Sequence, residues 1–269
     1  MSDVTAGQNY DLRDEIKAYW SERAATFDLS PGHEIFSEEE RAAWHRLFLR
    51  HLGRGDGRAA LDLASGTGVI SHLLDDLGFK VTGLDWAEPM LERARQKARE
   101  RKRSISFRVG DAESTMEPDD HYDVIVNRHL VWTLVHPAAA FAEWLRVLKP
   151  GGRLLIVDGD FVNTSALERV FSKFSAWGQR AGIFKPDAPM HSREMMETHR
   201  SILSRVYFSN GARAEAVVEL LQAAGFTDVV VDTELGEIHR TQAKHWNLFK
   251  GMARKSQHRY AIRASKRVI

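Results

Sequence analysis

The chain has 269 residues, of which 43% are hydrophobic and 28% charged, and its formal net charge is +1. These values are typical of a globular protein with one large core, and the net charge points neither to a nucleic-acid binder nor to an acidic tail. The chain contains no cysteine, which excludes disulfides, thiolate metal sites and a cysteine nucleophile. No apolar run reaches the ~18 residues of a membrane span, and the N-terminus lacks a signal-peptide core, so we expect a cytoplasmic protein.

The first 54 residues are expected to form a helical lid. Apolar residues spaced three and four apart predict a helix over residues 11–27. A second helix is predicted after Ser37, because Glu40 three residues later completes a capping box. The glycine-rich stretch GRGDG at 53–57 ends this part of the chain.

From residue 58, short apolar strands alternate with amphipathic helices. We predict strands at 59–63, 80–84, 104–109, 122–126 and 153–158, and helices at 69–77, 88–101 and 137–148. This alternation is typical of an α/β fold, a Rossmann-like parallel sheet with helices on both faces.

The alternation stops at residues 160–208, which are rich in aromatic residues, Met and Arg. We predict a helical insertion here that meets the N-terminal helices as a cap over the sheet. After it, the sequence predicts helices at 212–224 and 240–252 and strands at 229–232 and 260–266. We therefore expect an N-terminal lid at 1–54 and a core at 55–269 that includes 160–208 as a substrate cap.

The loop after the first strand carries two glycines. Residues 61–69 read LDLASGTGV and place Gly66 and Gly68 where backbone N–H groups can face a polar ligand. A dinucleotide fingerprint would add a third glycine, but Ser71 stands there. Asp85 ends the next strand, where a carboxylate can accept hydrogen bonds from both ribose hydroxyls. Alone, these features fit a dinucleotide, another nucleoside-bearing cofactor, or a turn without a ligand.

Four further motifs follow that loop, namely GLDWAEPML, VGDAES, YDVIVNRHLVWTLVHP and LRVLKPGGRLLIVD. With them the chain resembles the class I S-adenosylmethionine-dependent methyltransferases over residues 55–160, and again at GARAEAVVELLQAAGF. The resemblance implies S-adenosylmethionine as cofactor. It also implies a seven-stranded sheet whose last strand, supplied by RYAIRASKRV, is antiparallel.

The resemblance also implies a set of cofactor contacts. The loop backbone at Ala64, Gly66 and Gly68 would face the amino-acid end of the cofactor. Ala64 replaces the family's first glycine, and we expect this position to need only a conformation that alanine can adopt. The other implied contacts are Asp85 with the ribose, Trp86 and Met90 beside the adenine, Asp111 and the backbone N–H of Ala112 with the adenine edge, and Asn127 with the methionine moiety. Tyr19 and Arg23 lie four residues apart on one helical face, so both would reach the cofactor carboxylate.

Several of these assignments have a structural alternative. Asp85 would instead be a solvated acid at a strand end, and Asp111 would cap a short helix that follows it. Trp86 and Met90 would belong to the core. Arg23 would be a surface arginine packed along a core tyrosine.

The stretch NRHLVWTL carries the candidate catalytic residue. Methyl transfer from a sulfonium is an in-line displacement, so the protein must mainly position the acceptor, and a base is needed only if the acceptor loses a proton. His129 is the best-placed base because an unperturbed imidazole titrates near ~6.5; a buried structural histidine is the alternative. Arg128, Trp132 and Tyr207 are expected at the substrate pocket, with packing beneath the loop as the alternative for Trp132. Further candidates in the insertion are His191, His199 and Arg205.

Two classes of methyl acceptor remain open. A small molecule methylated at nitrogen, oxygen, sulfur or an activated carbon is the main hypothesis, as in the enzymes of cofactor and secondary metabolism that the chain resembles. Residues 239–269 hold nine Lys/Arg and no Asp/Glu, which motivates RNA or protein methylation as the alternative. No nucleic-acid-binding module is recognisable, so we expect no nucleic-acid partner. A non-catalytic nucleoside-binding protein is the third reading.

The histidines do not predict a metal site. The chain has 12 of them, but none of their spacings places two ligands convincingly on one helix face. Because thiolates are also absent, we expect no metal. We expect no membrane partner either, and the sequence leaves the oligomeric state open.

Overall fold

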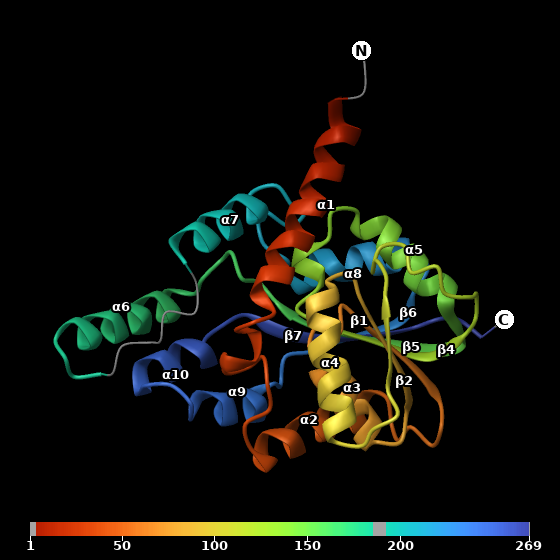
Figure 1. Ribbon diagram of the computed structural model, residues 1–269, viewed down its shortest axis with the longest axis horizontal. Coiled ribbons are helices and arrows are strands. Elements are labelled where there is room, and N and C mark those ends of the chain that lie inside the picture. Colours follow the sequence, from red (N-terminus) through yellow and green to blue (C-terminus); the bar gives the residue numbers. More distant parts are fainter. Residues whose placement is uncertain (1–3, 185–191, 269) are drawn as a thin grey trace.

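The computed structural model describes residues 4–184 and 192–268 and contains a seven-stranded sheet with the strand order β3-β2-β1-β4-β5-β7-β6 (Figure 1). The strands are β1 (Ala59–Leu63), β2 (Lys80–Asp85), β3 (Ser106–Val109), β4 (Tyr122–Arg128), β5 (Leu148–Gly159), β6 (Thr227–Asp232) and β7 (Arg259–Ser265). Strands β1 to β5 pair in parallel, whereas β7 is antiparallel to both β5 and β6. The expected Rossmann-like sheet with an antiparallel last strand is confirmed.

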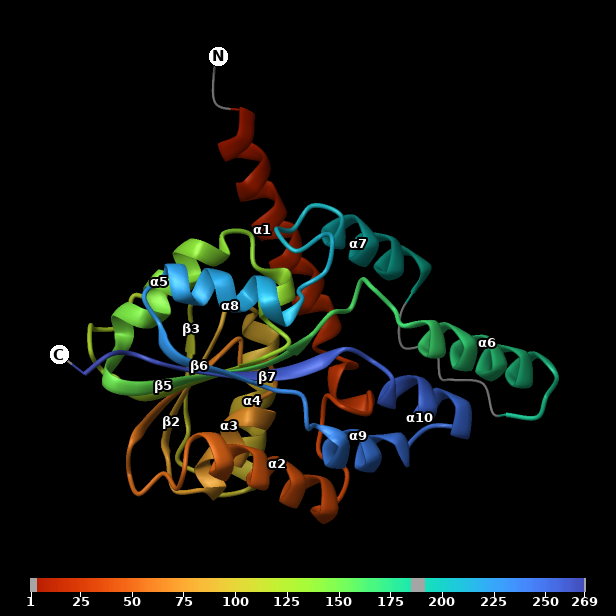
Figure 2. The ribbon, with the colours of Figure 1, turned by 180° about the vertical axis from the view of Figure 1, so that it is seen from behind.

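Helices cover both faces of this sheet. They are α1 (Val4–Arg23), α2 (Glu38–His51), α3 (Val69–Asp76), α4 (Glu88–Glu100), α5 (Pro137–Val147), α6 (Ala166–Arg180), α7 (Arg193–Leu203), α8 (Ala214–Ala223), α9 (Gly236–Ala243) and α10 (Leu248–Lys255). Figure 2 shows α5 and α8 on one face and α2 and α3 on the other.

The central strands are buried on both faces, which explains why they are almost continuously apolar. In β4, Val124 and Val126 pack with α2 and α3, whereas Ile125 between them packs with α5 and α8. In β5, Leu155 and Ile156 divide between the two faces in the same way. Because alternate residues of a strand point to opposite faces of the sheet, one apolar run contributes side chains to two cores.

The N-terminal helix and part of the insertion meet beside the sheet. Ile16 and Tyr19 of α1 pack with Met195 and Ile202 of α7 in one buried cluster. The other insertion helix, α6, lies against α10 and projects from the body of the molecule (Figures 1 and 2). The division into lid, core and substrate cap stays a prediction, since a shared cluster does not define a domain.

Two helix predictions need correction. The single helix expected at 240–252 is in fact α9 and α10, which are separated because Asn247 begins a new helix. Its side chain accepts a hydrogen bond from the backbone N–H of Lys250, as is typical of an N-cap asparagine. The helix expected at 11–27 ends at Arg23, and a short 3-10 helix follows at Phe27–Leu29.

Ala64, directly after β1, also differs from expectation. The φ angle of Ala64 is +52°, which lies in the left-handed region. Alanine does not adopt this conformation freely. The Cβ of an L-residue clashes with the following carbonyl in this region, at a cost of about 1–2 kcal/mol, whereas glycine avoids the clash. The glycine typical of this position is therefore explained by backbone conformation, and alanine carries strain there.

We predict that Ala64→Gly raises the free energy of unfolding by about 0.5–1 kcal/mol, because relief of strain exceeds the extra entropy that glycine gives the unfolded chain. Chemical denaturation measures the change. The matched control is Ala59→Gly at the other end of β1, whose φ is not positive and which should lose about 0.5–1 kcal/mol. Equal losses in both variants would contradict the account.

Candidate functional site

A cavity of about 770 Å³ opens at the carboxyl ends of β1, β2 and β4. In open α/β sheets this edge is where ligands bind. Thirteen residues expected from the sequence line the cavity: Tyr19, Arg23, Ala64, Gly66, Asp85, Trp86, Met90, Asp111, Ala112, Arg128, His129, Trp132 and His199. Four of the expected residues that the structure describes do not line it: Gly68, Asn127, Arg205 and Tyr207.

Asp85 links the glycine loop to the end of β2. Its carboxylate accepts hydrogen bonds from the backbone N–H groups of Gly66 and Ala87, each at 2.8 Å. Burial raises the pKa of Asp85 to about 6, although these N–H groups oppose the shift. The carboxylate is therefore buried and oriented, unlike a solvated acid at a strand end.

Gly68 has a packing role. It has a φ of +82° and precedes the first residue of α3. A Cβ at this position would lie 2.9 Å from the ring of Phe107 and 3.1 Å from the Cβ of Ala94. Glycine is required here because α3, α4 and β3 approach each other closely at this point.

Asp111 follows β3 and is held from two sides. It forms an ion pair with Arg13 of α1, and its Oδ1 accepts the backbone N–H of Glu113 at 2.9 Å. The chain after Asp111 is a turn that closes on Ser114, so the helix-capping alternative is wrong. Asp111 instead ties the N-terminal helix to the edge of the cavity.

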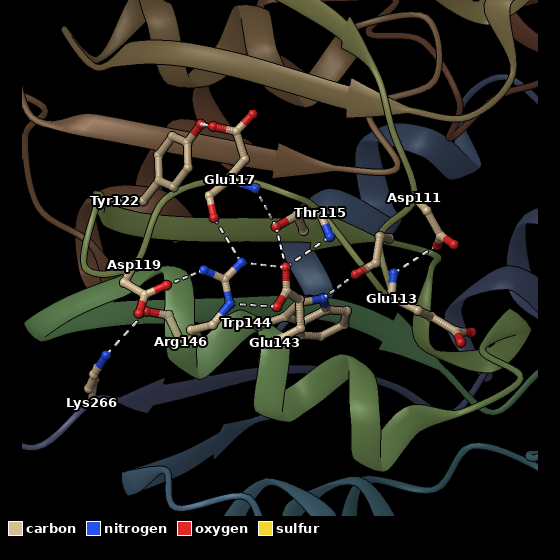
Figure 3. Close-up of polar contacts among 11 residues, drawn as sticks. Asp111, Glu113, Thr115, Glu117, Asp119, Tyr122, Glu143, Trp144, Arg146 and Lys266 are labelled. Carbon is tan, nitrogen blue, oxygen red and sulfur yellow. Dashed lines mark hydrogen bonds and ion pairs between the residues drawn. The ribbon is translucent and has the colours of Figure 1, made fainter.

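The loop that carries Asp111 and Ala112 is fastened to α5 (Figure 3). The carbonyl of Ala112 accepts the indole N–H of Trp144 at 2.7 Å, and the carboxylate of Glu143 accepts both the backbone N–H and the hydroxyl of Thr115. Arg146 holds Glu143 in place and lowers the pKa of its carboxyl to about 2. The backbone of this loop is therefore fixed on the side away from the cavity.

Tyr19 and Arg23 lie side by side in the cavity wall. Arg23 is only 2% exposed, so the surface-arginine alternative is wrong. Burial lowers the pKa of Arg23 and raises that of Tyr19. Arg23 donates to the hydroxyl of Thr26 at 2.7 Å, which places a cation beside the glycine loop at the end of α1.

His129 stands in a strained conformation at the end of β4. Its φ is +59°, and its backbone N–H donates to the carbonyl of Val157 at 3.1 Å. Its Nε2 accepts a hydrogen bond from Nη1 of Arg259 at 2.7 Å. Burial and the charge of Arg128 hold the pKa of His129 well below its ordinary value. The imidazole is neutral, and the lone pair that a base would use is engaged by Arg259.

His33, which was not among the predicted site residues, lies near His129. Its Nδ1 donates to the carbonyl of Phe27 at 3.2 Å, and its ring stacks on that of Phe27 at 4.2 Å. The His33 and His129 ring centroids are 6.2 Å apart. Burial, followed by the charge of Arg128, lowers the pKa of His33 to about 3, so both imidazoles are neutral at physiological pH.

The remaining predicted residues divide between cavity and surface. The Trp132 ring makes edge contacts with those of Trp20, Phe161 and His199, at centroid distances of 6.3, 5.8 and 5.5 Å. Tyr207 is 57% exposed and does not line the cavity, so its predicted substrate contact is wrong.

Three other predicted residues are not placed in the cavity lining. Arg205 pairs with Glu15 and does not line the cavity, so its candidate role as a substrate contact has no support in the structure. His191 lies outside the described residues. The side chain of Asn127 is buried behind the cavity, and its amide has no hydrogen-bond partner among the described residues.

Sequence reasoning missed one wall of the cavity. Trp246, Arg254 and Gln257 line it from α10 and its two flanks, and Arg259 lines it from β7. The basic stretch at residues 239–269, which contains no acid, was the sequence feature that could have revealed this wall, but it was interpreted as an outer surface for RNA or protein. The residues of this stretch that line the cavity recur at the spacing of one helical face, which would have indicated that this face is directed inward.

The described residues contain neither a metal-ligand cluster nor a membrane-spanning helix. Residues 4–184 and 192–268 hold no group of three His, Asp or Glu side chains arranged to bind a metal ion. Within the same two ranges, none of the helices combines the length and the apolar character needed to cross a bilayer.

Known proteins resemble the chain in sequence. A family model described as a methyltransferase domain matches residues 61–156. A demethylmenaquinone methyltransferase of Renibacterium salmoninarum is 29% identical over 161 residues, which cover 60% of this chain and 65% of the relative. A ubiquinone/menaquinone biosynthesis C-methyltransferase UbiE of Shewanella piezotolerans is 30% identical over 178 residues, which cover 64% of this chain and 68% of the relative. The chain thus spans about two thirds of the length of these relatives.

Solved structures show the same fold. A phosphoethanolamine N-methyltransferase 2 of Haemonchus contortus in complex with S-adenosyl-L-methionine superposes with a TM-score of 0.61 at 16% identity, covering 91% of this chain and 56% of that chain. The sequence match and the sheet topology agree. The chain belongs to the class I S-adenosylmethionine-dependent methyltransferases.

Proposed function

We propose that the enzyme transfers the methyl group to a small aromatic molecule enclosed in the cavity. One observation carries this proposal: a single cavity contains the predicted cofactor residues at one end and a second wall of aromatic and basic residues at the other. Two ligands in one cavity can meet at the close, aligned geometry that an in-line displacement requires. The curated relatives named above, whose names refer to quinones, support an aromatic acceptor.

The cofactor end is proposed from the position of each residue. Asp85 accepts hydrogen bonds from the ribose, and Trp86 and Met90 flank the adenine. Asp111 and the backbone of Ala112 contact the adenine edge, while Ala64 and Gly66 contact the amino-acid end. Tyr19 and Arg23 bind the cofactor carboxylate. Such a cofactor, when bound, supplies a methyl group on a positively charged sulfur.

The acceptor end is proposed to work mainly by positioning. Trp132 and Phe161 offer ring faces and edges to a planar acceptor and exclude water from the methyl group. His129 stays a predicted base only for a state in which Arg259 has left its Nε2, because the hydrogen bond between them uses the required lone pair. With Arg259 in place, the pair orients the acceptor and takes up no proton.

The proposed activity is tested with tritiated S-adenosylmethionine and a panel of acceptors. The panel contains 1,4-naphthohydroquinone with a short prenyl chain, 1,4-dihydroxy-2-naphthoate, total tRNA and unfolded protein. We expect label in at least one small aromatic acceptor and none in tRNA or protein. Label in the macromolecules alone would contradict the proposal. So would the absence of label from every small acceptor, if the protein binds the cofactor.

We predict that affinity for S-adenosylhomocysteine falls as pH is lowered through about 6. Above this pH the Asp85 carboxylate is ionised and accepts both ribose hydroxyls; below it the group is protonated and loses acceptor capacity. Asp85→Asn should weaken binding at least about tenfold and remove this pH dependence. Calorimetry between pH 5 and 8 measures both effects, with the exposed Asp228→Asn as control. An unchanged affinity in Asp85→Asn would contradict the predicted ribose contact.

We predict that His129→Gln lowers kcat less than tenfold and leaves the pH profile of kcat unchanged. General-base catalysis contributes about 10²–10⁴-fold, so a base would show a far larger loss together with a missing pH limb. Steady-state kinetics from pH 5.5 to 9 separates the two roles. The exposed His136→Gln serves as the matched control, and a loss of a hundredfold or more in His129→Gln alone would show that the base role is real.

A further inference from the structure

Three arginines from distant parts of the chain meet at the acceptor end of the cavity. Arg128 lies at the end of β4, Arg254 on α10 and Arg259 at the start of β7, and all three line the same space. The inference drawn from them rests on the proposed function, because it concerns the acceptor and not the cofactor.

Each of these guanidinium groups is held by neutral acceptors. Arg128 donates to the carbonyls of Gly32 and His33 at 3.0 and 3.1 Å. Arg254 donates to the side-chain oxygens of Gln242 and Gln257, each at 2.8 Å.

Arg259 follows the same pattern. It donates to Gln257 at 3.2 Å and to His129 at 2.7 Å. Among the described residues no ion pair joins Arg128, Arg254 or Arg259 to a carboxylate, although most other arginine contacts of the protein are of that kind.

The three side chains keep donors for a ligand. A guanidinium has five N–H groups, and these hydrogen bonds use two in Arg128, three in Arg254 and two in Arg259. These half-buried cations form no ion pair with a carboxylate among the described residues, so an anion that enters the cavity is favoured by both its charge and its hydrogen bonds.

The pKa values of groups in the cavity wall also show the effect of this positive charge. The charge of Arg128 contributes, after burial, to lowering the pKa of Arg254 to about 10 and that of His33 to about 3. Carboxylates also act on this wall: Asp62 and Glu40 raise the pKa of Arg128, and Glu40 and Glu168 raise that of Arg254, against the larger effect of burial. None of them forms an ion pair with either guanidinium among the described residues, and Glu168 instead accepts a hydrogen bond from Gln257 at 3.0 Å.

Aromatic rings complete the wall. Arg259 lies over the ring of Phe161 at 4.9 Å, and Arg254 lies over that of Trp246 at 5.7 Å. A guanidinium fixed on an aromatic face keeps its edge free for a planar, two-oxygen partner. We propose that Arg128, Arg254 and Arg259 bind an anionic oxygen group, a carboxylate or a phenolate, on the planar aromatic methyl acceptor.

The carboxylate arm of the test compares 2-naphthoate with its neutral isostere 2-naphthamide, by calorimetry on protein saturated with S-adenosylhomocysteine. We expect wild type to bind the naphthoate at least about tenfold more tightly than the amide. Arg259→Gln and Arg254→Gln should each weaken naphthoate binding about 10- to 100-fold and leave amide binding and S-adenosylhomocysteine binding nearly unchanged.

The matched control is Arg263→Gln on the same strand as Arg259. Its guanidinium donates to the carbonyl of Asp228 and lies outside the cavity, so it should change neither affinity. Arg259→Lys keeps the charge but loses the planar fork, and we expect an intermediate loss.

The phenolate arm uses 4-nitrophenol, whose anion absorbs visible light. Bound to wild type, it should ionise at a lower pH than in solution, and Arg259→Gln should reduce this shift. A shift without naphthoate selectivity assigns the site to phenolates, and selectivity without a shift assigns it to carboxylates.

Three results would overturn the proposal. The first is that wild type shows neither naphthoate selectivity nor a nitrophenol shift, a comparison that does not depend on the variants folding. The second is an equal loss of naphthoate and amide binding in the arginine variants, which indicates that the arginines only hold the wall together. The third is a loss of S-adenosylhomocysteine affinity in these variants, which assigns the arginines to the cofactor carboxylate. A failure of methyl transfer would contradict the proposed function and not the anion site, and it is measured separately in the tritium assay.

Discussion

The hydrogen bonds between the Asp85 carboxylate and the backbone of Gly66 and Ala87 join the two strand ends on which the site depends. They fix the loop after β1 against the end of β2 and orient a buried acid toward the cavity. The cost is a raised pKa, which burial imposes on the unliganded protein. A ligand that donates hydrogen bonds to this carboxylate, such as the proposed ribose diol, would recover part of that cost.

The other walls of the cavity are brought to this point by elements distant in sequence. The first helix contributes Tyr19 and Arg23, and the pairing of Arg13 with Asp111 ties this helix to the loop after β3. The C-terminal elements contribute Arg254 and Arg259. Because β7 inserts between β5 and β6, the start of this last strand lies beside the end of β5 and near His129. Because β7 is antiparallel, Arg259 at its start lies at the edge of the sheet where the parallel strands end.

The parallel strands could be predicted from the sequence, because apolar strand periodicity lies within short windows. The antiparallel last strand was implied only by the resemblance to the methyltransferases, and so were the cofactor contacts, which stay predictions. The conformation of Ala64 was missed, since φ depends on the turn and not on the residue. Tyr207 was misplaced for a related reason, because its chain segment is close to the cavity but its side chain points to solvent. Arg254 and Arg259 were missed because a basic stretch has the same composition whether it faces solvent or a cavity.

The central claim is that one cavity holds the cofactor at Asp85 and the acceptor beyond His129. A crystal structure of the complex with S-adenosylhomocysteine tests this claim most directly. The account predicts both ribose hydroxyls within hydrogen-bond distance of the Asp85 carboxylate, about 2.5–3.0 Å, with the sulfur directed toward the wall formed by Trp132 and Arg259. A ribose bound away from Asp85, or a sulfur directed away from that wall, would contradict it.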